Sequence, residues 1–250
     1  MILQRRIPYD ITAPRPLPGI APLEMRDWLI ADEAYAAQMA ERARLLSDHR
    51  ADVLWLDRGA LDAARELMAM VLAHLPDGFE VTGSAVRCPD GRSVQTDTDD
   101  PLGSLGHILQ EDLCLMVREG DDDEHVLKGA VLCFPASWTL AQKANRPLIR
   151  ILQPVDAYDD TMARRVQRLF DGVREGRPLW RFNALWYDDP TLFQPRPENA
   201  PRAAIDRSKA PYFRSERQSL VRLPQTGAVV FSIHTYVVAR RDVPEGALET

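Results

Sequence analysis

The sequence predicts an α+β protein in which helices cover an antiparallel sheet. Apolar residues recur at three- and four-residue steps in the first third of the chain, as they do in helices. Strand-like apolar segments then follow at short separations, with two helical segments between them. This order differs from the regular alternation that builds a parallel sheet. Because no linker-like break divides the apolar segments, we expect one domain over residues 1–250, with an extended arm at 1–24 and a globular part at 25–250.

The first half of the chain is expected to be mainly helical. Closely spaced prolines prevent a helix in the first two dozen residues and favour an extended arm on the domain surface. Behind it, helical periodicity predicts two long helices, the second ended by a Pro-Asp-Gly turn at 76–78. The expected elements are helices at 26–48, 60–75 and 105–116, with a loop or short strand at 83–103.

The second half is expected to supply most of the sheet. Runs rich in Val, Leu and aromatic residues indicate strands, and Pro135 and Pro154 end two of them. Pro224 to Gly227 has the composition of a hairpin turn. The expected elements are strands at 126–134, 148–152 and 179–187, helices from a Ser137 cap to Asn145 and at 159–175, a loop at 188–212, and a hairpin of 219–223 with 228–239.

Composition excludes several classes of protein. Hydrophobic content of 45% and charged content of 27% are ordinary for a globular chain that can bury a core. A net charge of -6, with arginines scattered among acids, argues against a nucleic-acid surface. Three widely spaced cysteines suit reduced thiols, and no long apolar run indicates a signal peptide or membrane span. We therefore expect a cytoplasmic protein that contacts neither nucleic acid nor membrane.

General catalytic motifs are absent from the sequence. There is no GxGxxG, Walker loop, GxSxG or HExxH, and the five histidines show no metal-ligand spacing. For any one of these histidines, a solvated or capping role is more common than a catalytic one.

Two polar groups stand out within apolar segments. Gln110-Glu111-Asp112 lies among leucines, so one carboxylate is expected to meet a buried partner, the alternative being a surface salt bridge. In the strand around Arg181, alternation places Arg181 and Asn183 on one face and Trp180 and Phe182 on the other. Arg181 and Asn183 are suited to hold an anionic ligand, or else they form the solvated side of a sheet.

Two further groups belong to the final hairpin. The segment 214–218 carries Arg214, Glu216 and Arg217, which predicts either an internal ion-pair network or an anion clamp at a pocket rim. In the last strand Ser232, His234 and Tyr236 share one face. His234 and Tyr236 are candidates for contact with a cofactor or substrate, the alternative being a hydrogen-bonded structural role.

Together these segments resemble the haem-dependent oxidative N-demethylase family, alpha (haem-binding) subunit. The matching stretches fall in order along nearly the whole chain, and their combination is more specific than any one of them. They are 22–29 with Tyr35, 110–116, 133–138 with Lys143, 154–155, 181–183, 214–218 with Leu220, 222–224, and 231–236.

The resemblance implies a PAS-like antiparallel sheet that holds haem b. It implies a haem-dependent oxidoreductase of the monooxygenase type, which removes a methyl group from a small secondary amine and releases formaldehyde. Electrons would come through flavin and iron-sulfur groups on partner reductase subunits. On this basis the expected catalytic residues are Glu111, Asp112, His234 and Tyr236, and the expected cofactor-binding residues are Arg181, Asn183, Arg214, Arg217 and Gln218. We expect Arg181, Asn183, His234 and Tyr236 to surround one enclosed cavity.

One position departs from the pattern that the resemblance implies. The family has an Ile-His pair before its Pro-Val, and that histidine is the natural axial ligand, whereas here Leu152 occupies its place. Leucine cannot bind iron. Either His107, His234 or Tyr236 is then the ligand, or the chain binds no haem. The alternative functions are a non-catalytic PAS-like module that binds haem or another small ligand, and a partner-binding subunit with a vestigial pocket.

Overall fold

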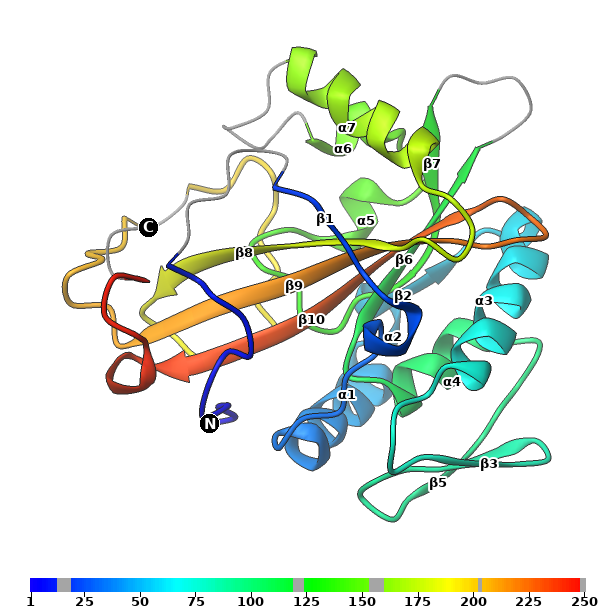
Figure 1. Cartoon of the computed structure of the whole chain (residues 1–250), viewed down its shortest axis with the longest axis horizontal. Helices are drawn as coiled ribbons and strands as arrows, with labels where there is room; N and C mark the ends of the chain where they lie inside the picture. The colour runs from blue at the N-terminus through cyan, green and yellow to red at the C-terminus, as the bar shows by residue number, and fades with distance from the viewer. Residues whose placement is uncertain (13–18, 119–123, 153–159, 202–203, 248–250) are drawn as a thin grey trace.

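A computed structural model describes residues 1–12, 19–118, 124–152, 160–201 and 204–247, without the side chains of 160–164. Within these residues a seven-stranded antiparallel sheet has the order β1-β8-β9-β10-β6-β7-β2 (Figure 1). Its strands are β1 Ala21–Pro22, β2 Leu54–Leu56, β6 Asp112–Arg118, β7 His125–Val131, β8 Leu179–Tyr187, β9 Tyr212–Arg222 and β10 Val229–Ala239. The predicted α+β class with a helix-covered antiparallel sheet is confirmed, and it is consistent with a PAS-like sheet.

One face of the sheet packs against the N-terminal helices. These are α1 Tyr35–Asp48, α2 Arg50–Val53, α3 Leu61–Ala73 and α4 Pro101–Ile108, with short 3-10 turns at η1 Met25–Asp27 and η2 Arg58–Ala60. Leu46 and Leu105 from the helices meet Leu113 and Val131 from the sheet in a continuous apolar core. A small second sheet, β3 Glu80–Thr82, β4 Ala85–Arg87 and β5 Ser93–Gln95, lies beside α4 (Figure 1).

The opposite face carries the later helices. These are α5 Leu140–Lys143, α6 Leu148–Leu152 and α7 Asp160–Gly172, and a 3-10 turn η3 Arg240–Asp242 follows β10. Figure 1 shows α6 and α7 on the far side of the sheet from α1, α3 and α4. Because side chains alternate along a strand, Cys114 and Met116 of β6 belong to this second core, whereas Leu113 and Leu115 belong to the first.

The predicted helix at 105–116 is wrong. The helix ends at Ile108 and β6 begins at Asp112. Both faces of this strand are buried, so its apolar residues do not alternate with polar ones, and such a run cannot be distinguished from a helix by periodicity. Pairing with β10 and β7 determines the strand.

The predicted strand at 148–152 is also wrong, because these residues form α6. The predicted helix at 26–48 begins only at Tyr35, after the η1 turn. Ser137 is not a helix cap: its φ is 66°, and α5 follows Thr139 without a side-chain cap. β2 was not predicted.

Other elements match their predicted places. Helices 60–75 and 159–175 correspond to α3 and α7, strand 126–134 to β7, and strand 179–187 to β8. The final hairpin is confirmed, although β9 begins at Tyr212, earlier than the predicted 219. The described part of the N-terminal arm contains no helix before Met25, and its residues Ala21 and Pro22 pair with β8.

Candidate functional site

A cavity of about 730 Å³ lies between the sheet and the later helices. Strands β6, β8, β9 and β10 supply residues to its sheet side, and α5, α6 and α7 supply residues to the other side. This volume falls within the range of roughly 300–1,000 Å³ that ligand pockets in proteins usually have. The expected cavity was to be surrounded by Arg181, Asn183, His234 and Tyr236, and of these Arg181 and Asn183 line the one observed.

Much of the cavity wall is apolar. Side chains from helices α6 and α7 and from several strands supply it, including Met116, Leu148, Leu152, Phe170, Leu220 and Phe231. A wall of this kind excludes water and binds the faces of a flat hydrocarbon ring through the area it buries.

The polar part of the lining comes mainly from β8 and β9. Arg181 pairs with Gln218 across these strands, and Asn183 pairs with Glu216, so all four side chains point into the cavity. Asn183 and Gln218 each donate a side-chain hydrogen bond of 3.1 Å to Oε2 of Glu216. The Arg214 Nη2 atom lies 3.7 Å from the other carboxylate oxygen of Glu216. The carboxylate is thereby fixed in a buried position.

Arg196 and Arg214 on the lining each have a buried Nε donor with no acceptor among the described residues. Arg214 donates to the carbonyl oxygens of Leu192 and Phe134, yet its Nε meets no acceptor among the described residues. The same holds for Nε of Arg196, whose Nη1 donates to Ala200. A buried donor without an acceptor is unfavourable, and an anionic ligand in the cavity would supply the acceptors.

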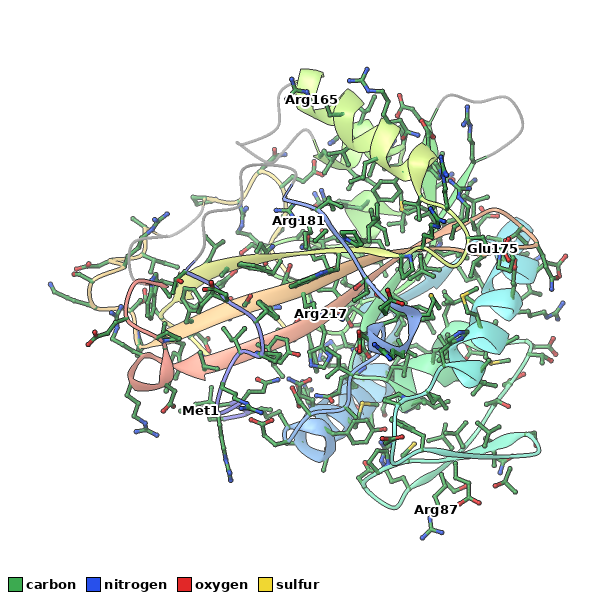
Figure 2. The ribbon with its side chains drawn as sticks, viewed as in Figure 1. Met1, Arg87, Arg165, Glu175, Arg181 and Arg217 are labelled. Carbon is green, nitrogen blue, oxygen red and sulfur yellow. The ribbon has the colours of Figure 1, made fainter. Side chains whose placement is uncertain are left out.

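Arg217 was expected among the cofactor-binding residues, but it lies on the opposite face of the sheet and does not line the cavity. It occupies the alternate position on β9, donates to the carbonyl oxygens of Asp27 and Trp28, and packs over the ring of Trp180. Figure 2 labels Arg181 on the α7 side of the strands and Arg217 on the other side. The strand alternation predicted for Arg181 and Asn183 is confirmed by their place on the lining.

His234 and Tyr236 also face away from the cavity. The two rings lie 4.6 Å apart between their centroids, and the cavity lining on β10 comes instead from Phe231 and Ile233. The prediction that Ser232, His234 and Tyr236 share a face is consistent with this arrangement, in which the odd-numbered residues Phe231 and Ile233 of β10 face the cavity. The prediction that His234 and Tyr236 surround one cavity with Arg181 and Asn183 is wrong, because the register of β10 against β9 directs them to the N-terminal side.

His234 lies between two carboxylates. Its Nδ1 is 3.1 Å from Glu111 Oε1, and its Nε2 is 3.1 Å from Asp32 Oδ2. Burial alone would lower the pKa of His234, but these two acidic partners raise it to about 9. Burial would raise the pKa of Asp32, yet hydrogen bonds, chiefly from His234, lower it to about 2. The imidazole is therefore charged at neutral pH and held by opposite charges.

The remaining candidate residues also lie outside the cavity. Asp112 forms a buried ion pair of 2.6 Å with Arg42 and accepts the backbone N–H groups of Cys133 and Phe134. The expectation that a carboxylate of this segment meets a buried partner is thus consistent with both Glu111 and Asp112. His107 is half-buried on α4, where burial lowers its pKa, and it does not line the cavity.

Several lining residues were missing from the expected catalytic and cofactor-binding residues. Glu216 has the same strand parity as Arg214 and Gln218, so a strand assignment that reached Tyr212 would have identified it. Lys143 appeared only as part of the family resemblance. Arg196 and Glu198 lie in an irregular, proline-rich segment that carries no periodic signal.

Comparison with protein-family models matches residues 19–248 to the family described as "Haem-dependent oxidative N-demethylase, alpha subunit-like". The chain belongs to this family. The family name implies dependence on haem and a place in a complex of several subunits. Within the described part of the chain, none of the helices combines the length and apolar character needed to cross a bilayer.

The cavity fits a tetrapyrrole in its walls and at its polar side. The apolar wall suits the ring faces, and the spare Nε atoms of Arg196 and Arg214 suit propionates. The position of Leu152 does not fit an iron ligand, because its hydrocarbon side chain lines the cavity where the resemblance implies a histidine. Among the described residues, no group of three or more His, Cys, Asp or Glu side chains is arranged to hold a metal ion.

Proposed function

We propose that this chain is the haem-binding subunit of an oxidative demethylase that acts on a small secondary amine and releases formaldehyde. The observation that carries the proposal is the pairing of an apolar wall with two buried, unsatisfied guanidinium donors in one cavity. Bound haem b would supply the oxidising chemistry, and flavin and iron-sulfur groups on reductase partners would supply the electrons. Three free, buried cysteines support a cytoplasmic location.

Different lining residues would bind the haem and the amine substrate. Arg196 and Arg214 would pair with the propionates, and the apolar wall would keep water from the reacting carbon. Glu216, oriented by Asn183 and Gln218, would accept the N–H groups of the protonated amine and so position its methyl group. In this assignment Glu111, Asp112, His234 and Tyr236 support the sheet from its other face.

Haem reconstitution tests this proposal. We expect the purified protein to acquire a Soret band on titration with haem, and Arg196→Met to weaken haem binding by roughly 10- to 150-fold, since a charged hydrogen bond contributes roughly 1.5–3 kcal/mol. Arg241→Met is the control, because the Arg241 side chain is 85% exposed. A wild-type protein that shows no Soret band and no saturable haem titration would contradict haem binding.

A second candidate function is a binding module without turnover. The observation that favours it is Leu152, which places hydrocarbon where an axial ligand is implied. Such a module would bind a flat anionic ligand and be stabilised by it through mass action, with no oxidation of amines.

The variant Leu152→His distinguishes the two candidates. If an axial ligand has been lost at this position, the added imidazole will shift the Soret band and tighten haem binding, while Leu169→His serves as a second histidine on the lining. A Leu152→His spectrum identical to that of the wild type would show that position 152 does not reach the iron. Formaldehyde release by the wild-type complex with its reductase would support the demethylase.

A further inference from the structure

Lysine is rare in this chain. Lysine and arginine together number 31, yet the sequence contains lysine only at Lys128, Lys143 and Lys209. Arginine therefore carries almost all the structural cation roles described above. A lysine on the cavity lining departs from this preference.

Lys143 is the lysine on the cavity lining. Its side chain is 8% exposed, and its Nζ donates a hydrogen bond of 2.7 Å to the carbonyl oxygen of Ile151. Glu198 Oε1 lies 3.7 Å from the same nitrogen, and the ring of Trp138 lies 6.0 Å away. The amine is thus confined to one place in a partly apolar enclosure.

This environment lowers the pKa of the Lys143 amine. Burial lowers the pKa of Lys143, and Arg150 adds to the effect, while Glu198 opposes it. A buried lysine with a lowered pKa is more nucleophilic at neutral pH than an exposed one.

The other two lysines lack this combination. Lys128 is buried, but its Nζ is bound to Asn145 at 2.8 Å and lies 3.9 Å from Asp57, and it does not line the cavity. Lys209 is 83% exposed and pairs with Asp206. Lys128 and Lys209 can therefore serve as internal controls for chemistry at Lys143.

We propose that Lys143 is a carbonyl-capture site, whose amine forms a Schiff base with a small aldehyde that enters the cavity. Its nitrogen bonds to the carbonyl carbon as the C=O electron pair moves to oxygen, and a proton passes from nitrogen to that oxygen. Loss of water from the carbinolamine then gives the imine, with no oxidant or reductant consumed. The Glu198 carboxylate, 3.7 Å from this nitrogen, would approach it to transfer the proton and to stabilise the protonated imine.

The inference extends the proposed function without requiring bound haem. Formaldehyde, the expected product of the proposed reaction, belongs to the class of aldehydes that would react. Capture depends on the amine and the enclosure, so it can be tested on protein that carries no haem. A missing Soret band and missing aldehyde capture are separate outcomes.

Reductive trapping tests the proposal. The full-length protein is mixed with acetaldehyde and cyanoborohydride at neutral pH, and the modified peptides are identified by mass spectrometry. We expect the adduct to form first at Lys143, ahead of the exposed Lys209 and the N-terminal amine. Modification that follows exposure instead, with Lys143 unlabelled while Lys209 and the N-terminus react, would overturn the proposal. This comparison needs no variant, so it does not depend on the folding of a mutant.

Two variants sharpen the result. Lys143→Arg keeps a cation that can donate to Ile151 but cannot form a stable imine, so the adduct at this position should be lost. Lys209→Arg should leave labelling of Lys143 unchanged. Slower trapping at Lys143 after addition of a saturating flat anionic porphyrin is also expected, because both would occupy one cavity; undiminished trapping would contradict the assigned location.

Discussion

At the scale of single residues, a buried cluster of charged groups lies outside the cavity. His234 is buried between Asp32 and Glu111, and Gln110 and Gln4 donate further hydrogen bonds to Asp32. Charges removed from water are stable only when they are paired and hydrogen-bonded. The cluster joins the N-terminal segment to β10, and thereby fixes the strand whose other face forms part of the cavity.

The cluster predicts a pH dependence of stability. The pKa of His234 is raised from 6.5 to about 9, so its contribution is complete below pH 6.5 and is lost as pH rises through about 9. The pKa of Asp32 is lowered from 3.8 to about 2, so its contribution is lost only as pH falls through about 2. We expect wild-type stability to decline between pH 6.5 and 9, by up to about 3 kcal/mol.

Urea denaturation across this pH range measures the effect. His234→Gln should be less stable than wild type at pH 6 and should show a flatter decline toward pH 9. His49→Gln is the control, because the His49 side chain is 42% exposed. Parallel wild-type and His234→Gln curves would contradict the assignment of the decline to this residue.

At the scale of elements, Arg222 of β9 is one of the residues that attach the C-terminal end of α7 to the sheet. Arg222 of β9 donates from Nη2 to the carbonyl oxygen of Phe170 at 2.9 Å and from Nε to that of Val173 at 2.5 Å. These carbonyls belong to the end of α7, where helix carbonyl groups lack helical partners. The same guanidinium donates to Gly227 in the hairpin turn, so the helix over the cavity and the β9–β10 turn share one anchor.

Substitution of Arg222 should loosen this attachment. Arg222→Met keeps much of the apolar stem but removes the donors, so we expect a loss of about 1–3 kcal/mol and faster hydrogen exchange at residues 165–173. Arg168→Met is the control within that range, because Arg168 is exposed. Unchanged exchange in Arg222→Met would show that the other contacts of α7, including those of Gln167 with His125, hold the helix without Arg222.

The elements that the sequence misassigned share a physical cause. β6 is buried on both faces and α6 is five residues long, so neither displays a full period of its own pattern. By contrast, β8 carries aromatic residues on one face and polar ones on the other, and α3 has a long apolar stripe. The local sequence pattern was sufficient to assign an element whose two faces differ in polarity. The other elements are determined by long-range contacts, which the local pattern does not contain.

At the scale of the whole molecule, the sequence identified the polar strand segments but could not assign them to layers. Arg181, Asn183, Arg214 and Gln218 were predicted as ligand-binding residues, and all four line the cavity. His234 was grouped with them because alternation shows only which side chains of one strand share a face. It does not show which layer of helices that face packs against. That choice follows from the β9–β10 register, which depends on the complete fold. The single domain over 1–250 stays a prediction.

Strand β9 has a consequence for how the protein can change. Arg214, Glu216 and Gln218 serve the cavity, while Ser215 and Arg217 between them hold the N-terminal side. Substitution of one cavity-facing side chain can thus change which ligand is preferred and leave the packing on the other face of the strand intact. Insertion or deletion of a single residue would instead move every later side chain of the strand to the opposite face. Arginine side chains would then enter the apolar core on the wrong side of the sheet. Diversification along this strand is therefore compatible with substitutions and incompatible with changes in length.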